Sequence, residues 1–225
     1  RTKGFVEGAV AEQVMAYILY FARRVDLQTA DMHDHSWNSR LMPGAKNRTL
    51  GLVGFGGIGT EVAKRAVPFG MKVIYFCRHP NPADDAAYGV QSVSMEELLK
   101  ESDYVVAAVP LTDQTFHLFN EECIAQMKAG SVLINIARGP VVDEEALAQA
   151  LASGHLGGCA VDVFPKEPCT DSVLTRYSNA LLTPHSATST AENSKATNFA
   201  AANNLVNYLK KDIDAKYVVV QGTRY

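Results

Sequence analysis

The sequence lacks the features that would direct the chain to nucleic acid, to a membrane or to a disulfide framework. Its 225 residues include only four cysteines and no CxxC pair, so we expect free thiols and a reducing, cytoplasmic setting. It has no block of basic residues and a net charge of -3, which argues against nucleic-acid binding because phosphate contacts need clustered Lys and Arg. The most apolar run near the N-terminus, residues 14–22, is far shorter than the roughly 20 residues of a membrane helix. We therefore expect no membrane contact.

The rest of the composition is that of a globular protein, with 47% apolar and 20% charged residues, and the length is enough to bury a full core. Apolar residues at a helical period predict a first helix over residues 6–25. Residues 26–48 show no such period and contain the single tryptophan, Trp37, so we predict a long connecting arm. Asp and His gather at 31–35 on that arm without matching ligands elsewhere in the sequence, and we predict no metal site.

From residue 49 onward, short apolar runs alternate with amphipathic ones, which is the pattern of a parallel sheet covered by helices on both faces. Ser94 with Glu97 reads as a capping box, and Asn120 and Asp143 are suitable N-caps for further helices. With right-handed crossovers, the predicted fold is α/β, a doubly wound parallel sheet of the Rossmann type. The strands are predicted at 49–53, 72–76, near Val90, 104–109, 131–136, 158–163 and 180–182, with a last long helix at 190–210 and an apolar run at 217–220.

A glycine-rich turn is the strongest motif for ligand binding. Gly54, Gly56 and Gly59 form GxGxxG directly after a predicted strand and directly before a helix. In a dinucleotide site the first glycine permits the tight turn, the second lets the backbone approach the pyrophosphate, and the third lets helix and strand pack closely. A plain glycine-rich turn, or a site for another nucleotide-like ligand such as the methyl donor of methyltransferases, would carry the same pattern.

The end of the second predicted strand bears on the choice of cofactor. A site specific for NAD usually has Asp or Glu about 20 residues after the glycine turn, to bind the ribose 2'-hydroxyl. Here Cys77 stands at that place and Arg78 follows it. An acid would repel a 2'-phosphate, whereas the Arg78 guanidinium could bind it. NADP is therefore the preferred cofactor, with NAD as the alternative in which Arg78 lies over the adenine or in solvent.

Three polar residues follow predicted strands on the side where open parallel sheets bind ligands, namely Arg138, Glu167 and His185. They lie in the motifs NIARG at 135–139, VDVFPKEP at 161–168 and TPHSA at 183–187. With GLVGFGGIG at 51–59 and VPLTDQT at 109–115, the sequence resembles the D-isomer-specific 2-hydroxyacid dehydrogenases over about residues 9–209. Taken singly, each of the three has an ordinary alternative as a surface charge or a loop residue. Together and in family order, they favour catalysis.

The resemblance implies a role for each of the three. The residue matching Arg138 grips the substrate carboxylate, which suits a planar guanidinium. The residue matching His185 donates a proton to the C2 oxygen in reduction and takes it back in oxidation. The residue matching Glu167 pairs with that imidazole, orients it and stabilises the imidazolium. The related formate dehydrogenases carry glutamine in place of Glu167, so a carbon dioxide-forming role is disfavoured.

The resemblance also implies a set of cofactor contacts. Asp162 would hold the nicotinamide carboxamide, while Gly57 and Ile58 would offer backbone to the pyrophosphate. The remaining residues that the resemblance places at the cofactor are Val109, Pro110, Thr115, Ile136, Ala137 and Ala187.

The domain organisation departs from the family pattern. The family begins with a separate substrate-binding domain, completed by the last helix, whereas this chain starts at Arg1 where the interdomain helix begins. We therefore expect that domain to be missing, with residues 1–189 forming the dinucleotide-binding domain and its leading helix and arm, and 190–225 a segment that would complete the substrate domain. In the family the helix and arm make the dimer, so a homodimer is expected.

The function expected is that of an oxidoreductase, a nicotinamide-dependent dehydrogenase that interconverts a small 2-keto acid and its D-2-hydroxy acid. Two other functions remain open from the sequence. One is a cofactor-binding regulatory module like the transcriptional corepressors that share this fold, and the other is a remnant that binds cofactor without catalysis. Residue types alone do not choose the 2-hydroxy acid, because Arg138 would recognise only the shared carboxylate.

Overall fold

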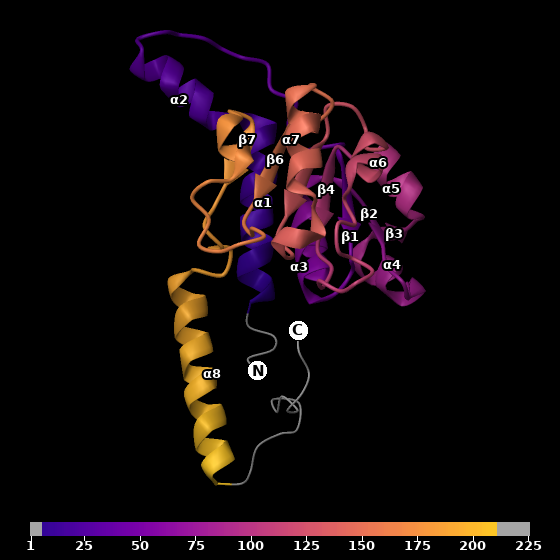
Figure 1. The fold of residues 1–225 in the computed structure, drawn as a ribbon, viewed down its shortest axis with the longest axis vertical. Helices are drawn as coiled ribbons and strands as arrows, with labels where there is room; N and C mark the ends of the chain where they lie inside the picture. Colours follow the sequence, from indigo (N-terminus) through magenta and orange to yellow (C-terminus); the bar gives the residue numbers. More distant parts are fainter. Residues whose placement is uncertain (1–5, 211–225) are drawn as a thin grey trace.

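Seven parallel strands form one sheet in the order β3-β2-β1-β4-β5-β6-β7 in the computed structural model, which describes residues 6–210 (Figure 1). The order reverses between β1 and β4, so the crossover between them leaves an opening at the carboxyl edge of the sheet. The predicted Rossmann fold is confirmed. The strands are β1 (Thr49–Val53), β2 (Lys72–Phe76), β3 (Val90–Ser92), β4 (Tyr104–Ala107), β5 (Val132–Asn135), β6 (Gly158–Val161) and β7 (Ala180–Leu182).

Helices cover both faces of the sheet, as the continuous apolar strands require. Every residue of β4, β5 and β6 is buried. On one face α1 and α3 pack over the central strands, and on the other α5, α6 and α7 do so. The helices are α1 (Glu7–Arg23), α2 (Val25–His33), α3 (Gly57–Ala66), α4 (Pro82–Tyr88), α5 (Met95–Glu101), α6 (Glu121–Ala125), α7 (Glu144–Ala152) and α8 (Ala191–Leu209), with short 3-10 turns η1 (Val67–Phe69), η2 (Gly139–Val141) and η3 (Val173–Arg176).

The predicted N-cap residues are confirmed, with the Ser94 side of the predicted capping box formed. Ser94 Oγ accepts the Glu97 amide at 3.1 Å, and Asn120 Oδ1 accepts the Cys123 amide at 2.9 Å. Asp143 Oδ1 likewise accepts the Glu145 amide. Strands β4, β5 and β6 end one or two residues before the predicted boundaries. Their last apolar residues leave the hydrogen-bonded ladder because the chain turns there toward the carboxyl edge.

The predicted arm over residues 26–48 is partly wrong, because Val25–His33 form the helix α2. No residue of α2 is buried, so the helix has no apolar period by which a sequence could show it. Polar contacts support it instead: Arg24 turns the chain in the left-handed region with φ 42 and pairs with Asp26 at 2.9 Å, and Arg40 pairs with Asp31 at 2.8 Å. The arm proper therefore begins after His33.

The last helix, α8, stands clear of the sheet and extends away from it (Figure 1). It buries no residue and exposes large apolar side chains, including Phe199, Tyr208 and Leu209. Within residues 6–210, no helix is both long enough and apolar enough to cross a membrane. The apolar run predicted at 217–220 lies outside the described residues.

Asp103, just before β4, forms hydrogen bonds with residues at the start of β1 and in the loop before β5. Its carboxylate accepts the Thr49 amide and Lys128 Nζ, both at 2.8 Å, and Arg48 Nη1 at 3.3 Å. Burial by itself raises the pKa of Asp103, but the bonds from Lys128 and Thr49 and the charge of Arg48 outweigh it, so the pKa lies below its ordinary value. A carboxyl with a depressed folded pKa stabilises the fold above its unfolded pKa, and this stabilisation is lost as the pH falls through the folded pKa.

We expect Asp103→Asn to lower the free energy of unfolding by about 1 kcal/mol near neutral pH, because a charge-assisted acceptor is replaced by a neutral one. The deficit shrinks as the pH falls below the ordinary pKa of an aspartate and through the lower folded pKa of Asp103, where the parent carboxyl is itself protonated. Urea denaturation as a function of pH measures this, with Asp113→Asn in the exposed loop after β4 as the control. Parallel pH curves for the parent and Asp103→Asn would contradict it.

Candidate active site

The glycine turn lies at the carboxyl end of β1 and opens α3. Gly54 has φ 101, and a Cβ there would stand 2.5 Å from the carbonyl oxygen of Ala108. A Cβ at Gly59 would stand 2.7 Å from the Gly54 oxygen, whereas at Gly56 it would meet nothing within 4 Å. Gly54 and Gly59 thus permit the tight turn and the close packing of strand and helix. Gly56 presents bare backbone to open space, as a pyrophosphate requires.

A cleft of about 430 Å³ opens beside this turn. Its walls come from the start of α3 and from the segments that follow β4 and β5, so it lies where the strand order reverses. The apolar walls and the open glycine backbone fit a dinucleotide. The lining residues are Ile58, Ala108, Val109, Pro110, Leu111, Ile136, Ala137 and Arg138, five of which the sequence placed at the cofactor.

Thr115, also placed at the cofactor, uses its hydroxyl inside its own loop. Thr115 Oγ1 donates to the Pro110 oxygen at 2.6 Å and accepts the Thr112 amide at 2.8 Å. These bonds close the loop that follows β4. Thr115 therefore shapes one wall of the cleft through Pro110.

Cys77 and Arg78 follow β2 at the same edge of the sheet. Cys77 is half-buried and packs against the core under α1 and α3. Arg78 is exposed, and its Nη1 donates to Gln114 Oε1 at 3.4 Å. A cation rather than a carboxylate thus faces solvent beyond the end of β2.

His185 and Glu167 form a direct pair, with 2.6 Å between His185 Nδ1 and Glu167 Oε2. The other carboxylate oxygen of Glu167 accepts the Phe164 amide at 2.9 Å. Partial burial raises the pKa of Glu167, but the bonds from His185 and Phe164 and the charges of His185 and Arg138 outweigh it, so the pKa is lowered and the group is an anion. His185 itself has φ 50, a left-handed conformation that is uncommon outside glycine and is often found at functional sites.

Arg138 lies on the turn after β5, at the mouth of the cleft. Asn135 holds that turn, since its Nδ2 donates to the Arg138 oxygen and its Oδ1 accepts the Ala137 amide, both at 3.1 Å. The next residue, Gly139, packs so closely that a Cβ would stand 2.0 Å from the carbonyl carbon of Phe164. The turn carrying Arg138 and the loop carrying Glu167 are therefore in backbone contact. The three residues named from the sequence come together at one place.

Asp162 is buried, with 2% of its surface exposed, and its carboxylate is already engaged. Oδ1 accepts the Ser186 amide at 2.8 Å and the Thr183 hydroxyl at 2.5 Å, and Oδ2 accepts the Ala187 amide at 3.0 Å. The sequence placed Asp162 at the nicotinamide and Ala187 at the cofactor, and the structure gives both of them a place in the network that holds the His185 segment. Thr183, and Tyr17 which bonds to it, were missed. The only signal of Tyr17 in the sequence is a hydroxyl within an apolar helical stretch, and that of Thr183 is its place in the TPHSA motif.

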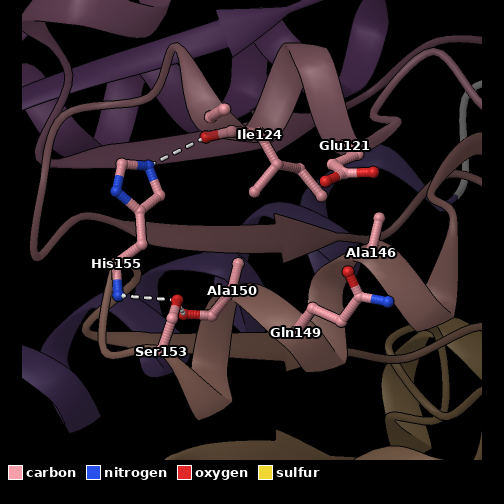
Figure 2. Close-up of a pocket in the computed structure, with 8 residues that line it drawn as sticks. Glu121, Ile124, Ala146, Gln149, Ala150, Ser153 and His155 are labelled. Atoms are coloured by element: carbon pink, nitrogen blue, oxygen red, sulfur yellow. Dashed lines mark hydrogen bonds between the residues drawn. The ribbon is translucent and has the colours of Figure 1, made fainter.

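A second hollow, of about 300 Å³, lies between α6 and α7 and shares no residue with the cleft. Figure 2 shows His155 at one end, where its Nε2 lies 3.0 Å from the Ile124 oxygen, and Glu121 and Gln149 toward the other. Within residues 6–210 the structure brings together no three His, Cys, Asp or Glu side chains that could hold a metal ion. The four cysteines are free thiols, of which Cys159 is buried.

The chain resembles known proteins over most of its length. Residues 15–187 match the family model described as D-isomer specific 2-hydroxyacid dehydrogenase, NAD binding domain. A glyoxylate reductase of Thermococcus litoralis is 38% identical over 96% of this chain and 68% of its own length. A hydroxypyruvate reductase of Thermotoga maritima is 41% identical over 85% of this chain and 63% of its own length.

Solved structures give the same result. A D-lactate dehydrogenase from Aquifex aeolicus, crystallised with NAD and lactic acid, superposes with a TM-score of 0.85 and 30% identity, over 93% of this chain and 68% of that one. The chain thus spans about two thirds of the length of these relatives.

We expect Gly139→Ala to destabilise the fold by about 1–3 kcal/mol, because the added methyl group cannot fit against Phe164 without moving backbone. Urea denaturation measures the loss. Gly8→Ala is the matched control, since a Cβ there would meet only Arg65 Nη2, at an ordinary 3.7 Å, and the change should stay within about 1 kcal/mol. Equal stability of the two variants would show that the backbone contact is not tight.

Proposed function

This chain belongs to the D-isomer specific 2-hydroxyacid dehydrogenase family, and from that premise we propose that it interconverts a small 2-keto acid and the corresponding D-2-hydroxy acid. The family, the oxidoreductase class and a nicotinamide cofactor, all expected from the sequence, are confirmed by the match to the NAD binding domain and to the named relatives. The observation that carries the proposal is the His185–Glu167 pair, 2.6 Å apart and close to Arg138.

The proposed chemistry divides between cofactor and protein. When bound, the nicotinamide ring supplies the hydride that reaches C2 of the keto acid, or accepts it in the reverse direction. His185 holds the proton that the C2 oxygen needs as charge develops on it. The Glu167 carboxylate is hydrogen-bonded to Nδ1 of the imidazole. Nε2 is therefore the nitrogen that would face the substrate.

Arg138 is the proposed anchor for the substrate carboxylate. The residue is exposed and lines the cleft, its Nη1 donates to the Ala137 oxygen at 2.7 Å, and its backbone is held by Asn135. A planar cation on a fixed turn can form two parallel hydrogen bonds to a carboxylate. This contact would place C2 between the cleft and His185, and it would select 2-keto acids as a class.

NADP is proposed as the preferred cofactor. The support is the exposed guanidinium of Arg78 beyond β2 and the thiol of Cys77 at the place where an NAD-specific site usually has an acid. A 2'-phosphate would gain a charge-assisted bond from Arg78 and would meet no carboxylate from Cys77.

We also propose a homodimer and a division of the chain near residue 189. The support for the dimer is the apolar surface on α2 and the arm, where Trp37 is 85% exposed and Met32 55%. The support for the division is the separation of α8 from the sheet (Figure 1). In this proposal residues 190–225 pack against a substrate domain.

The activity is tested by following oxidation of NADPH and NADH with glyoxylate, hydroxypyruvate, pyruvate and phosphohydroxypyruvate. We expect His185→Gln to lower kcat by about 10²–10⁴-fold, since it removes the proton donor. Arg138→Ala should lower kcat/KM by about 100-fold through loss of the carboxylate contact. Cofactor affinity, from fluorescence titration, should be unchanged in both.

His155→Gln is the control for these substitutions, because His155 lies in the separate hollow between α6 and α7. Its kcat should match that of the parent. Lack of turnover by the parent with all four keto acids would overturn the proposed activity, and full activity of His185→Gln would overturn the role of His185.

For the cofactor, we expect Cys77→Asp to shift the ratio of NADPH to NADH affinity toward NADH by about tenfold or more, because the new carboxylate repels the 2'-phosphate. Fluorescence titration with each cofactor gives the ratio. Cys169→Asp, in the loop beyond Glu167, is the charge-matched control. If the ratio is the same in both variants, Cys77 and Arg78 do not set the preference.

A further inference from the structure

A chain of hydroxyl groups runs from α1 to the segment that carries His185. Tyr17 Oη and Thr183 Oγ1 are 2.5 Å apart, and Thr183 Oγ1 is 2.5 Å from Asp162 Oδ1. Thr183 has one hydroxyl proton, and the Asp162 carboxylate can only accept. The proton of Thr183 therefore points to Asp162, and Tyr17 donates to Thr183.

Asp162 in turn holds three consecutive residues. Its backbone oxygen accepts the His185 amide at 2.8 Å, and its carboxylate accepts the amides of Ser186 and Ala187. Because His185 is in the left-handed region, this segment needs outside support to keep its conformation. The bonds to Asp162 provide it.

Tyr17 is suited to the end of this chain. It is 1% exposed in the middle of α1, and its ring packs in the core between α1 and the sheet. Burial raises the pKa of Tyr17 above its ordinary value, so the phenol keeps its proton and can donate it to Thr183. A buried hydroxyl of this kind needs a partner, and Thr183 is that partner.

The helix α1 also reaches the cofactor turn. At its start, the Glu7 side chain lies against Gly57, where an added Cβ would stand 2.9 Å from Glu7 Cγ. One rigid helix thus contacts the glycine turn at one end and the His185 segment through Tyr17.

We propose that Tyr17 is a positioning residue for His185, acting through Thr183 and Asp162, so that α1 sets the orientation of the imidazole relative to the glycine turn. The inference rests on the proposed role of His185 as acid and base. Thr183 links Tyr17 to Asp162, and its hydroxyl is also the third hydrogen-bond donor to the buried Asp162 carboxylate.

The test is amide hydrogen exchange by NMR on the full chain, with Tyr17→Phe, Thr183→Val and Thr183→Ser. Tyr17→Phe keeps the ring and removes one hydroxyl. We expect the Ser186 and Ala187 amides to exchange about tenfold faster in Tyr17→Phe, and faster still in Thr183→Val, as the bonds to Asp162 weaken. Thr183→Ser should restore parent rates, because it keeps the hydroxyl. Tyr20→Phe is the control, since Tyr20 is on the same helix and bonds to the surface residue Asp26.

The same variants are assayed for keto-acid reduction. We expect Tyr17→Phe to lower kcat about tenfold with KM within about twofold, because a displaced imidazole affects the transition state more than substrate binding. Faster exchange at Ser186 and Ala187 without any turnover by the parent would refute the proposed function but leave the positioning network standing. Unchanged exchange at these amides, or equal acceleration of amides throughout β5 and β6, would overturn the role of Tyr17.

Discussion

The candidate site depends on one buried carboxylate, that of Asp162. An ionised group that is 2% exposed is tolerated only when donors surround it, and here two backbone amides and one hydroxyl do so. The same hydrogen bonds offset both the cost of burying the charge and the cost of the left-handed His185 backbone. Removing the acceptor would leave the part-buried Ser186 amide and the buried Ala187 amide unpaired, and an unpaired buried donor costs more than a typical hydrogen bond contributes in net stability. The position of His185 is therefore set by its bonds to Asp162, a residue of the buried core.

The side chains of the proposed acid–base pair are more open to water. His185 and Glu167 expose 45% and 35% of their side chains. In such surroundings long-range attraction between charges is screened, and short hydrogen bonds in fixed geometry matter more. The orientation of the imidazole therefore owes more to the bond with Glu167 and to the Asp162 network than to the general field of the site.

Local patterns in the sequence were enough to predict the sheet, the glycine turn, the caps at Ser94, Asn120 and Asp143, and the grouping of Arg138, Glu167 and His185. Each depends on residues near one another in sequence, or on the rule that parallel strands share a carboxyl edge. The helix α2 could not be predicted because it buries nothing and so has no apolar period. The Tyr17–Thr183 bond could not be predicted because its partners are 166 residues apart and Tyr17 belongs to no motif. Asp162 was predicted to contact the nicotinamide. Its bonds to Thr183, Ser186 and Ala187 could not be predicted, because they form only when β6 and the segment after β7 lie side by side.

The contact of Gly139 with Phe164 has a consequence for the choice of substrate. The turn that carries Arg138 and the loop that carries Glu167 meet through backbone atoms, with no side chain between them that could be exchanged for a larger or smaller one. The backbone positions that carry the proposed carboxylate anchor and the proposed acid–base pair are then held at one spacing by main-chain packing, whichever 2-keto acid is bound. Differences in the rest of the substrate must then be accommodated on the side of the cleft away from Gly139 and Phe164. Relatives of this protein could act on different 2-keto acids while C2 keeps the same position.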